Sequence, residues 1–261
     1  MIIKQIAKKI TPPDIWNYLG RSYNELAWRC NPISKTSSQR MRAYKNKHRG
    51  QRCFIIGNGP SLKKMDLSPL RNEFTFGMNR IYLLFPEIGF HTTYFISINR
   101  LVIEQFAEDI ANLPMPQFLS QRGQQHVKFT ERTIFLYPRI GLRFSYKPQW
   151  YIYEGPTVTY TALQLAYYMG FKQAVLIGVD HNFQTKGRAN QEVISTGEDP
   201  NHFASNYFGK GIHWQLPNLE GSEHVYKIAK EVYTRDGRTI LDATVDGKLH
   251  VYPKVDYANL F

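Results

Sequence analysis

One short stretch, from Arg52 to Leu62, constrains the fold of this chain more than any other. It opens with a wholly apolar run, Cys53 to Ile56, and continues as Gly57-Asn58-Gly59-Pro60-Ser61. An apolar run of this length is typical of a strand that is covered on both faces, as the strands of a parallel sheet are. Glycine permits a tight turn and a close approach of the backbone to a ligand, and proline suits the first position of a helix. The stretch therefore predicts a strand, a phosphate-binding loop and a helix, which is how nucleotide-binding α/β domains begin.

The glycine loop, residues 57–61, does not identify a ligand by itself. It lacks the GK[ST] ending of a P-loop and the third glycine of the dinucleotide fingerprint. An ordinary turn from strand to helix is an equal alternative when the loop is considered alone.

Length and composition indicate a folded protein of one large domain, or of one domain with an appendage. The chain has 261 residues, of which 43% are hydrophobic, and this is ample for a buried core. No apolar run reaches the roughly 18 residues of a transmembrane helix, and the first ten residues lack the features of a secretory signal. Two cysteines, Cys30 and Cys53, are too few for a disulfide framework. We therefore expect reduced thiols and a cytoplasmic location.

The net charge of +12 is concentrated at the start of the chain. Residues 1–52 hold 12 Lys or Arg and 2 Asp or Glu, whereas the remainder holds 21 and 19. We expect residues 1–50 to form a basic helical arm and residues 51–261 to form the catalytic domain. Four isoleucines recur at helical spacing in the arm, a second short helix follows from Ile15, and the polar stretch 34–52 reads as a linker. The four are Ile2, Ile3, Ile6 and Ile10.

Two interpretations of the arm remain open. It is suited to lie on an anionic membrane surface, which would make the protein peripheral at the inner membrane face. It is equally suited to be a solvated arm that packs its isoleucines on the domain. Nucleic-acid binding is a weaker interpretation and we expect none, because no nucleic-acid-binding motif is visible. A monomer and a homo-oligomer both stay open.

The residues after the glycine loop alternate between apolar runs and helical patterns. Strands are predicted at 74–79, 94–99, 134–137, 174–180 and 239–243, and helices at 101–113, 157–168 and 223–235, the last capped by Ser222. A hairpin is predicted at 244–251, around Asp246-Gly247. This alternation predicts a Rossmann-like, mostly parallel sheet flanked by helices in one GT-A-like α/β domain, with the basic arm before it and a small C-terminal lid or hairpin after it.

Polar residues stand where several of these strands end. Asn79, Asn99 and Asp180 each close a predicted strand, and Gly178 precedes Asp180. Ligands of open parallel sheets bind beyond the carboxyl ends of the strands, and an Asn amide can both donate and accept hydrogen bonds there. For either Asn alone, the start of a turn is the better explanation. Aromatic and basic residues fill 138–156, which reads either as an acceptor-facing lid or as a packed surface loop.

Three of these segments carry a resemblance to known families: residues 55–62, 76–79 and 177–180. They resemble the MptE-like family, which is named after an archaeal 6-hydroxymethylpterin diphosphokinase. The order of motifs is also similar to that of the family 42 bacterial sialyltransferases and the central domain of flagellin-modifying Maf proteins. The resemblance covers about residues 51–260 and excludes the basic arm.

The sialyltransferase resemblance implies a metal-independent, inverting transfer of a sialic-acid-like nonulosonate, or a similar sugar, from a CMP-sugar to a glycan or lipid-linked acceptor. It implies no cofactor besides that donor. The positions that it places around the donor are Gly57, Asn58, Gly59, Ser61, Asn79, Asn99 and Asp180. From their places in the sequence pattern we add four more candidates for the same site: Pro60 in the loop, Thr157 and Thr159 at the start of a predicted helix, and Gly178 before Asp180.

The same resemblance makes His202, in the long segment 181–221, the general base. An imidazole suits this work, because it takes up a proton near neutral pH. The departing phosphate needs hydrogen-bond donors, for which Tyr207, Lys210 and Lys186 are candidates. Two positions depart from the sialyltransferase pattern: Val158-Thr159 stands where that family has Ser-Gly, and His181-Asn182 where it has a tyrosine.

The chief alternative is an MptE-like diphosphokinase that moves pyrophosphate from ATP to a pterin alcohol. That chemistry needs Mg²⁺ held by carboxylates and phosphates, with Asp66, Asp180 and Asp199 as candidates. A metal site made of Asp180, His181, Asp199 and His202 is a further alternative, and a non-catalytic nucleotide-binding module is a third.

Overall fold

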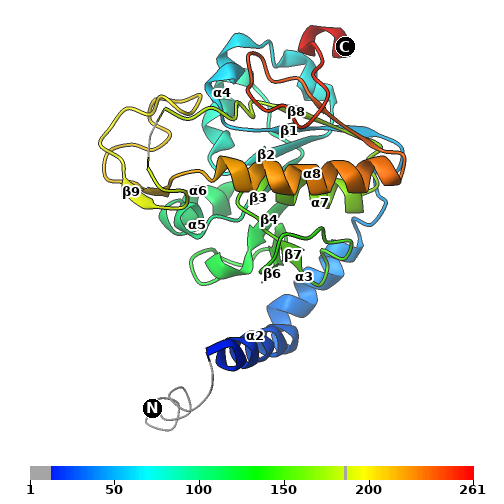
Figure 1. The fold of residues 1–261 in the computed structure, drawn as a ribbon, viewed down its shortest axis with the longest axis vertical. Helices are drawn as coiled ribbons and strands as arrows, with labels where there is room; N and C mark the ends of the chain where they lie inside the picture. The colour runs from blue at the N-terminus through cyan, green and yellow to red at the C-terminus, as the bar shows by residue number, and fades with distance from the viewer. Residues whose placement is uncertain (1–12, 185–186) are drawn as a thin grey trace.

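A seven-stranded, wholly parallel sheet forms the centre of the molecule (Figure 1). The computed structural model describes residues 13–184 and 187–261, and side chains from residue 22 onward, so the predicted helix of the four isoleucines and the candidate Lys186 lie outside the described residues. The strand order is β11-β8-β1-β2-β3-β4-β5. The strands are β1 Arg52–Ile56, β2 Thr75–Met78, β3 Tyr94–Ser97, β4 Gln117–Ser120, β5 Thr133–Leu136, β8 Gln173–Ile177 and β11 Thr239–Asp242.

This sheet confirms the predicted Rossmann-like α/β class, with one strand that the sequence pattern does not show. The missed strand is β4, which has only Phe118 and Leu119 as apolar residues between Gln117 and Ser120. Gln117 is fully buried and its Nε2 donates to the carbonyl oxygens of Ile110 and Leu113. A polar side chain that satisfies its hydrogen bonds locally can begin a buried strand, but it hides that strand from a search for apolar runs.

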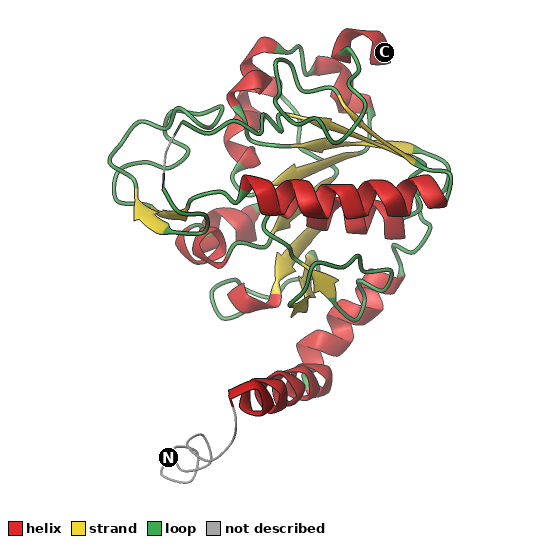
Figure 2. Cartoon of the chain, viewed as in Figure 1, coloured by secondary structure: helices red, strands yellow, loops and turns green. Residues whose placement is uncertain are grey.

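Helices cover both faces of the sheet (Figure 2). The long helices α7 (Val158–Tyr168) and α8 (Leu219–Arg235) lie on one face, where nine of the eleven residues of α7 are buried. The short helices α4 (Phe85–Ile88), α5 (Arg100–Gln105) and α6 (Ala107–Asn112) lie on the other. Because both faces are buried, the strands are mostly apolar, as residues 53–56 predict.

The chain changes direction at β1, and this change positions the site. It runs from β1 through β2, β3, β4 and β5 on one side, and then returns to place β8 and β11 on the other side of β1. The chain leaves β1 toward β2 on one side and leaves β8 toward β11 on the other side. This divergence leaves a crevice beyond the carboxyl ends of β1 and β8. Both ends carry glycines, Gly57 after β1 and Gly178 after β8.

The N-terminal segment is more helical than predicted. Helix α2 spans Pro13–Cys30, longer than the short helix expected from Ile15, and α3 spans Pro32–Arg42 inside the stretch that the sequence reads as a linker. The linker prediction is wrong because α3 buries Met41 in the core and its Ser37 Oγ accepts a hydrogen bond from the Phe135 backbone N–H of β5. Its sequence resembles a linker because two of its three buried residues, Ser34 and Ser37, are polar.

Three local predictions need correction. The helix predicted at 101–113 is broken at Phe106, where φ is −125° and ψ is 31°, into α5 and α6. Helix α8 begins one turn before the predicted start, because Asn218 rather than Ser222 caps it, by accepting from the Gly221 N–H at 2.8 Å. The predicted hairpin at 244–251 is instead a turn, followed by one parallel bridge between Asp242 and Lys254.

For the loop 138–156 the sequence left two interpretations open, an acceptor-facing lid and a packed surface loop. Gln164 of α7 is fully buried and binds this loop. Its Oε1 accepts from the Ser145 N–H at 3.0 Å, and its Nε2 donates to the Tyr153 carbonyl oxygen at 2.7 Å. Two short strands in this region, β6 (Pro138–Arg139) and β7 (Ile152–Tyr153), pair with each other. The loop is therefore packed on the domain rather than held open as a lid.

Candidate functional site

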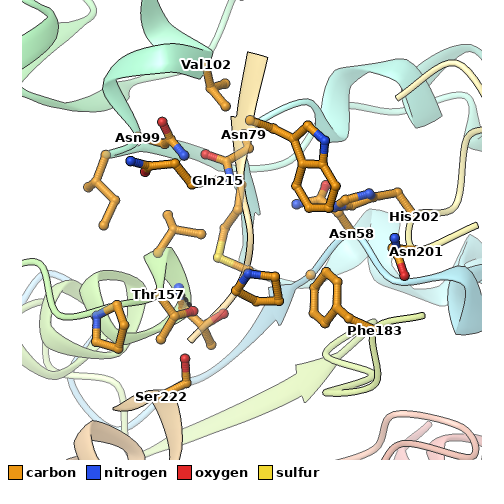
Figure 3. A pocket seen from close by; sticks show the side chains of 18 of the residues that line it. Asn58, Asn79, Asn99, Val102, Thr157, Phe183, Asn201, His202, Gln215 and Ser222 are labelled. Atoms are coloured by element: carbon orange, nitrogen blue, oxygen red, sulfur yellow. Dashed lines mark hydrogen bonds between the residues drawn. The ribbon is translucent and has the colours of Figure 1, made fainter. Parts of the chain in front are cut away.

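A cavity of about 450 Å³ lies beyond the carboxyl ends of β1, β2, β3 and β8 (Figure 3). Its position is the crevice that the strand order predicts. Most of the residues singled out from the sequence line it. They are Gly57, Asn58, Gly59, Asn79, Asn99, Thr157, Thr159, Gly178, Asp180, His202 and Tyr207, whereas Pro60, Ser61 and Lys210 do not line it.

The two glycines of the loop are required by the packing of β1 against β8. The Gly57 N–H donates to the Ile177 carbonyl oxygen at 2.7 Å, and the Gly59 N–H donates to the Gly178 carbonyl oxygen at 2.9 Å. A Cβ added at Gly57 would lie 2.1 Å from the Gly178 oxygen, and one at Gly59 would lie 1.7 Å from Asp180 Oδ2. The two glycines are thus needed because two chain segments cross closely here. The backbone N–H groups of Gly57 and Gly59 are already hydrogen-bonded to β8 and its following residue, so they are not free to bind a phosphate.

Asp180 orients the glycine loop. Its Oδ1 accepts from the Ser61 backbone N–H at 3.1 Å and its Oδ2 accepts from Ser61 Oγ at 2.7 Å. Burial raises the pKa of the Asp180 carboxyl, while the hydrogen bonds from Ser61 oppose the shift. Ser61 therefore acts on the cavity through Asp180, and Pro60 starts the short 3₁₀ helix Pro60–Lys64, as the sequence predicts.

Asn58 lines the cavity and carries an unsatisfied polar atom. Its Oδ1 is buried and, among the described residues, has no hydrogen-bond partner. A buried acceptor without a partner costs about 1–3 kcal/mol, so a ligand hydroxyl or amino group that reaches it would gain that contact. The side chain is labelled in the wall of the cavity in Figure 3.

Asn79 and Asn99 line the cavity, and the side-chain oxygen of each one also stabilises the local backbone or a neighbouring side chain. Asn79 takes a left-handed φ of 52°, and its Oδ1 accepts from Ser97 Oγ at 3.1 Å. Asn99 caps α5, with its Oδ1 accepting from the Leu101 N–H at 2.9 Å. The turn-forming role that suits Asn in general is therefore real in both cases. Because the oxygens are engaged, the amide NH₂ groups are the parts left to donate to a ligand.

His202 and Asp199 form a hydrogen-bonded pair at the edge of the cavity. Nδ1 of His202 lies 2.7 Å from Asp199 Oδ2, and the side chains are 12% and 5% exposed. Because the partner is a carboxylate, we assign the proton to Nδ1, which leaves Nε2 as an acceptor. The backbone joins this pair to the glycine loop, since the Phe203 N–H donates to the Asn58 carbonyl oxygen at 2.9 Å.

Tyr207 contributes its ring to this pair. It stacks on the His202 imidazole with centroids 4.0 Å apart and planes 3° from parallel. Its hydroxyl is buried and accepts from the Arg80 backbone N–H at 3.2 Å, and burial raises its pKa. The Arg80 guanidinium in turn donates to the Tyr207 carbonyl oxygen. Lys210, by contrast, is exposed and outside the cavity.

The start of α7 closes another side of the cavity. Thr157 caps the helix, with its Oγ1 accepting from the Thr159 N–H at 3.3 Å, and Oγ1 also lies 3.3 Å from the Tyr226 hydroxyl. Thr157, Val158 and Thr159 all line the cavity. The positive end of the helix dipole therefore faces the space where an anion would bind.

Glu154 also lines the cavity, although the sequence pattern does not predict a function for it. It is 8% exposed, its Oε1 accepts from Ser120 Oγ at 2.5 Å, and its Oε2 lies 3.1 Å from an Arg122 guanidinium nitrogen. Burial raises its pKa, and Arg122 and Ser120 oppose the rise. The signal in the sequence is Glu154-Gly155-Pro156-Thr157, in which an acid stands three residues before a helix cap.

The carboxylates proposed for a metal do not converge. Among the residues that the structure describes, no group of three or more His, Cys, Asp or Glu side chains is arranged to hold a metal ion. His181 pairs with Glu223 at 3.1 Å, apart from the Asp199–His202 pair. Asp66 accepts from the Ser68 N–H at a surface turn.

In the described parts of the chain, no helix has the length and apolar character needed to cross a membrane.

Comparison with solved structures identifies a shared fold. The Maf glycosyltransferase of Magnetospirillum magneticum AMB-1 aligns over 88% of this chain with a TM-score of 0.54 and 15% identity. This chain spans 39% of the length of that protein. A mammalian sialyltransferase in complex with Gal-β-1-3GalNAc-ortho-nitrophenol aligns over 76% of this chain and 70% of its own, with 12% identity. Its TM-score of 0.38 is too low to define a shared fold. Comparison with curated proteins gave no match.

The sheet, its switch point and the cavity beyond it thus define an α/β protein with a glycosyltransferase-like fold. The model of the family described as 6-hydroxymethylpterin diphosphokinase MptE-like matches residues 30–186, which is more than half of the chain. The chain belongs to this MptE-like family.

Proposed function

We propose that this protein is an inverting glycosyltransferase that moves a sugar from a CMP-sugar donor to a glycan or lipid-linked acceptor without a metal ion. The observation that carries the proposal is the Asp199–His202 pair, which the Phe203 N–H fixes to the glycine loop on the same cavity. A base oriented by a carboxylate is the arrangement that activates a hydroxyl nucleophile.

In the proposed reaction, His202 Nε2 takes the proton of an acceptor hydroxyl. The hydroxyl oxygen then forms a bond to the anomeric carbon on the face opposite the nucleotide, and the bond from that carbon to the phosphate oxygen breaks. The electron pair leaves with CMP, so the configuration at the anomeric carbon inverts. Asp199 stabilises the imidazolium that forms, and the stack on Tyr207 holds the ring in position.

The other residues that line the cavity suit a cytidine nucleotide. The unpartnered Oδ1 of Asn58 would accept from an amino or hydroxyl group, and the amides of Asn79 and Asn99 would donate. The start of α7 would face the phosphate, with Thr157 and Thr159 in the wall. Preorganised donors of this kind stabilise the charge that develops on a leaving phosphate.

The family name favours one competing function, a diphosphokinase that uses ATP and Mg²⁺. A thermal-shift series distinguishes the two. Stabilisation by CMP that EDTA does not change supports the transferase. Stabilisation by ATP only when Mg²⁺ is present, with none by CMP, supports the diphosphokinase.

The arm forms part of the same proposal. We propose that it rests on the anionic cytoplasmic face of a membrane, because α2 presents Tyr23 and Leu26 to solvent at 70% and 63% exposure, within a segment of net positive charge. Exposed apolar side chains flanked by Lys and Arg are the composition of interfacial helices.

A further inference from the structure

A second cavity lies beside the first, between α2 and the carboxyl ends of β4 and β5. Its volume is about 870 Å³. The sheet contributes Gln121 and Arg122 after β4 and Tyr137 after β5, and α2 contributes Asn24, Ala27 and Trp28. Figure 1 shows α2 below β6 and β7, away from the centre of the sheet. A pocket of this size is in the range that holds a ligand of several rings.

Arg122 connects the two cavities. It lines both of them, and its guanidinium lies 3.1 Å from Glu154 Oε2, which faces the first. Both cavities lie beyond the carboxyl ends of strands of one sheet, the first over β1, β2, β3 and β8, the second over β4 and β5. A molecule in the second cavity is therefore placed next to one in the first.

The charged side chains at the second cavity are engaged in ion pairs. Glu25 of α2 pairs with Arg139 and, at 2.6 Å, with Arg29. Arg122 pairs with Glu154. Each of these three arginines contacts a carboxylate, although Arg29 and Arg139 share Glu25, so the group of three guanidiniums and two carboxylates keeps a net charge of +1. A neutral ligand leaves these ion pairs intact, whereas an anion would have to compete with the carboxylates for the guanidiniums.

The uncharged part of the lining combines an aromatic wall with amide groups. Trp28 stacks on Tyr137 with centroids 6.2 Å apart and planes 17° from parallel. Asn24 and Gln121 supply amides that donate and accept. An aromatic face beside convergent amides fits a molecule that has apolar C–H faces and a rim of hydroxyls, which describes a saccharide.

We propose that the second cavity is the acceptor subsite and that it binds a neutral saccharide, whose reacting hydroxyl extends past Arg122 toward His202. This inference rests on the proposed function, since an acceptor exists only if the first cavity transfers a sugar. It narrows that function to acceptors whose portion next to the reacting sugar is uncharged. The outer face of α2, with Tyr23 and Leu26, stays free to meet a membrane.

Calorimetric titration of the full chain tests the proposal with lactose and N,N′-diacetylchitobiose as neutral probes and glucuronate and inorganic phosphate as anionic ones. Ala27 lines the cavity and is exposed, so Ala27→Trp fills the space without disturbing the core. Leu26→Trp adds a similar bulk one residue away, outside the lining, and is the matched control.

The proposal predicts that at least one disaccharide binds the wild type and Leu26→Trp alike, and binds Ala27→Trp at least tenfold more weakly. No binding of either disaccharide to the wild type, equal binding by Ala27→Trp, or tighter binding of the anions would overturn it. CMP is titrated separately into all three proteins. Absence of CMP binding contradicts the proposed function, whereas the saccharide result reports on the second cavity alone.

Discussion

Asp199 and His202 lie three residues apart, and the carboxylate of the first meets Nδ1 of the second at 2.7 Å. The pair belongs to a loop with little regular structure, yet it is fixed on three sides. Tyr207 stacks on the imidazole, the Asn201 N–H donates to Asp199 Oδ1 at 3.0 Å, and the Phe203 N–H donates to the glycine loop. These contacts distinguish His202 from an ordinary surface histidine and favour the proposed catalytic role.

Replacing the base should abolish transfer and spare nucleotide binding. We expect His202→Ala to lower the transfer rate by about 10²–10⁴-fold, the range that a general base supplies, with little change in the dissociation constant for CMP. Asp199→Asn should lower the rate less, because it disturbs the tautomer and orientation but keeps the imidazole. Transfer kinetics and CMP calorimetry measure the two effects.

The control for these variants is His250→Ala, at an exposed histidine outside the cavity. It should retain full transfer. If His202→Ala loses CMP binding as completely as transfer, the imidazole holds the nucleotide or the fold, and its assignment as the base is wrong.

The glycine loop should prove intolerant of a single methyl group. Gly59→Ala would place Cβ 1.7 Å from Asp180 Oδ2, in a buried crossing that cannot expand easily. We expect a loss of about 1–3 kcal/mol in the free energy of unfolding, which is typical of overpacking. Urea denaturation of Gly59→Ala and of Gly209→Ala, whose added Cβ meets nothing within 4 Å, makes the comparison. Equal stabilities of the two variants would show that the close approach is not required.

Glu154 should make stability depend on pH. Burial raises the pKa of its carboxyl above the ordinary value of 4.5, so the folded state binds the proton more tightly than the unfolded state. The stabilising effect is fully present below that ordinary value and is lost as the pH rises through the raised pKa. Glu154→Gln keeps an acceptor for Ser120 but cannot ionise. The melting temperature of Glu154→Gln minus that of the wild type should therefore increase between about pH 4 and pH 8, and a constant difference would contradict the shift.

The exposed apolar residues of α2 should contribute to membrane binding. We expect the double variant Tyr23→Ser/Leu26→Ser to sediment less with vesicles that contain anionic lipid, and added salt to weaken binding of the wild type, because the segment is basic. Ile194→Ser is the control, since Ile194 is 58% exposed on β9 (Glu192–Ile194), outside the arm. If the double variant sediments with the vesicles as much as the wild type does, Tyr23 and Leu26 do not anchor the arm and the membrane proposal is wrong.

The sequence predicts the buried framework well because burial leaves a direct trace. Runs such as Cys53 to Ile56 are apolar on both faces only in a covered sheet, and the glycine and asparagine residues that follow them mark the carboxyl edge where the cavity lies. Thus Asn79, Asn99 and Asp180 all line the cavity as expected.

The contacts that the sequence did not predict depend on partners far apart in the chain. Ser61 and Asp180 are separated by 119 positions, and their mutual hydrogen bonds leave no local signal. The amides of Gly57 and Gly59 are taken up by β8, which a loop motif alone cannot show. Likewise, α3 reads as a linker because two of its three buried residues, Ser34 and Ser37, are polar and leave only Met41 as an apolar signal.

The most direct test of the account is a crystal structure of the protein with CMP. The account predicts that the nucleotide occupies the first cavity, that a base or ribose group reaches the unpartnered Oδ1 of Asn58, and that the phosphate lies within reach of an acceptor held by His202 Nε2. Cytidylate bound outside this cavity, or an imidazole turned away from the phosphate side, would contradict it.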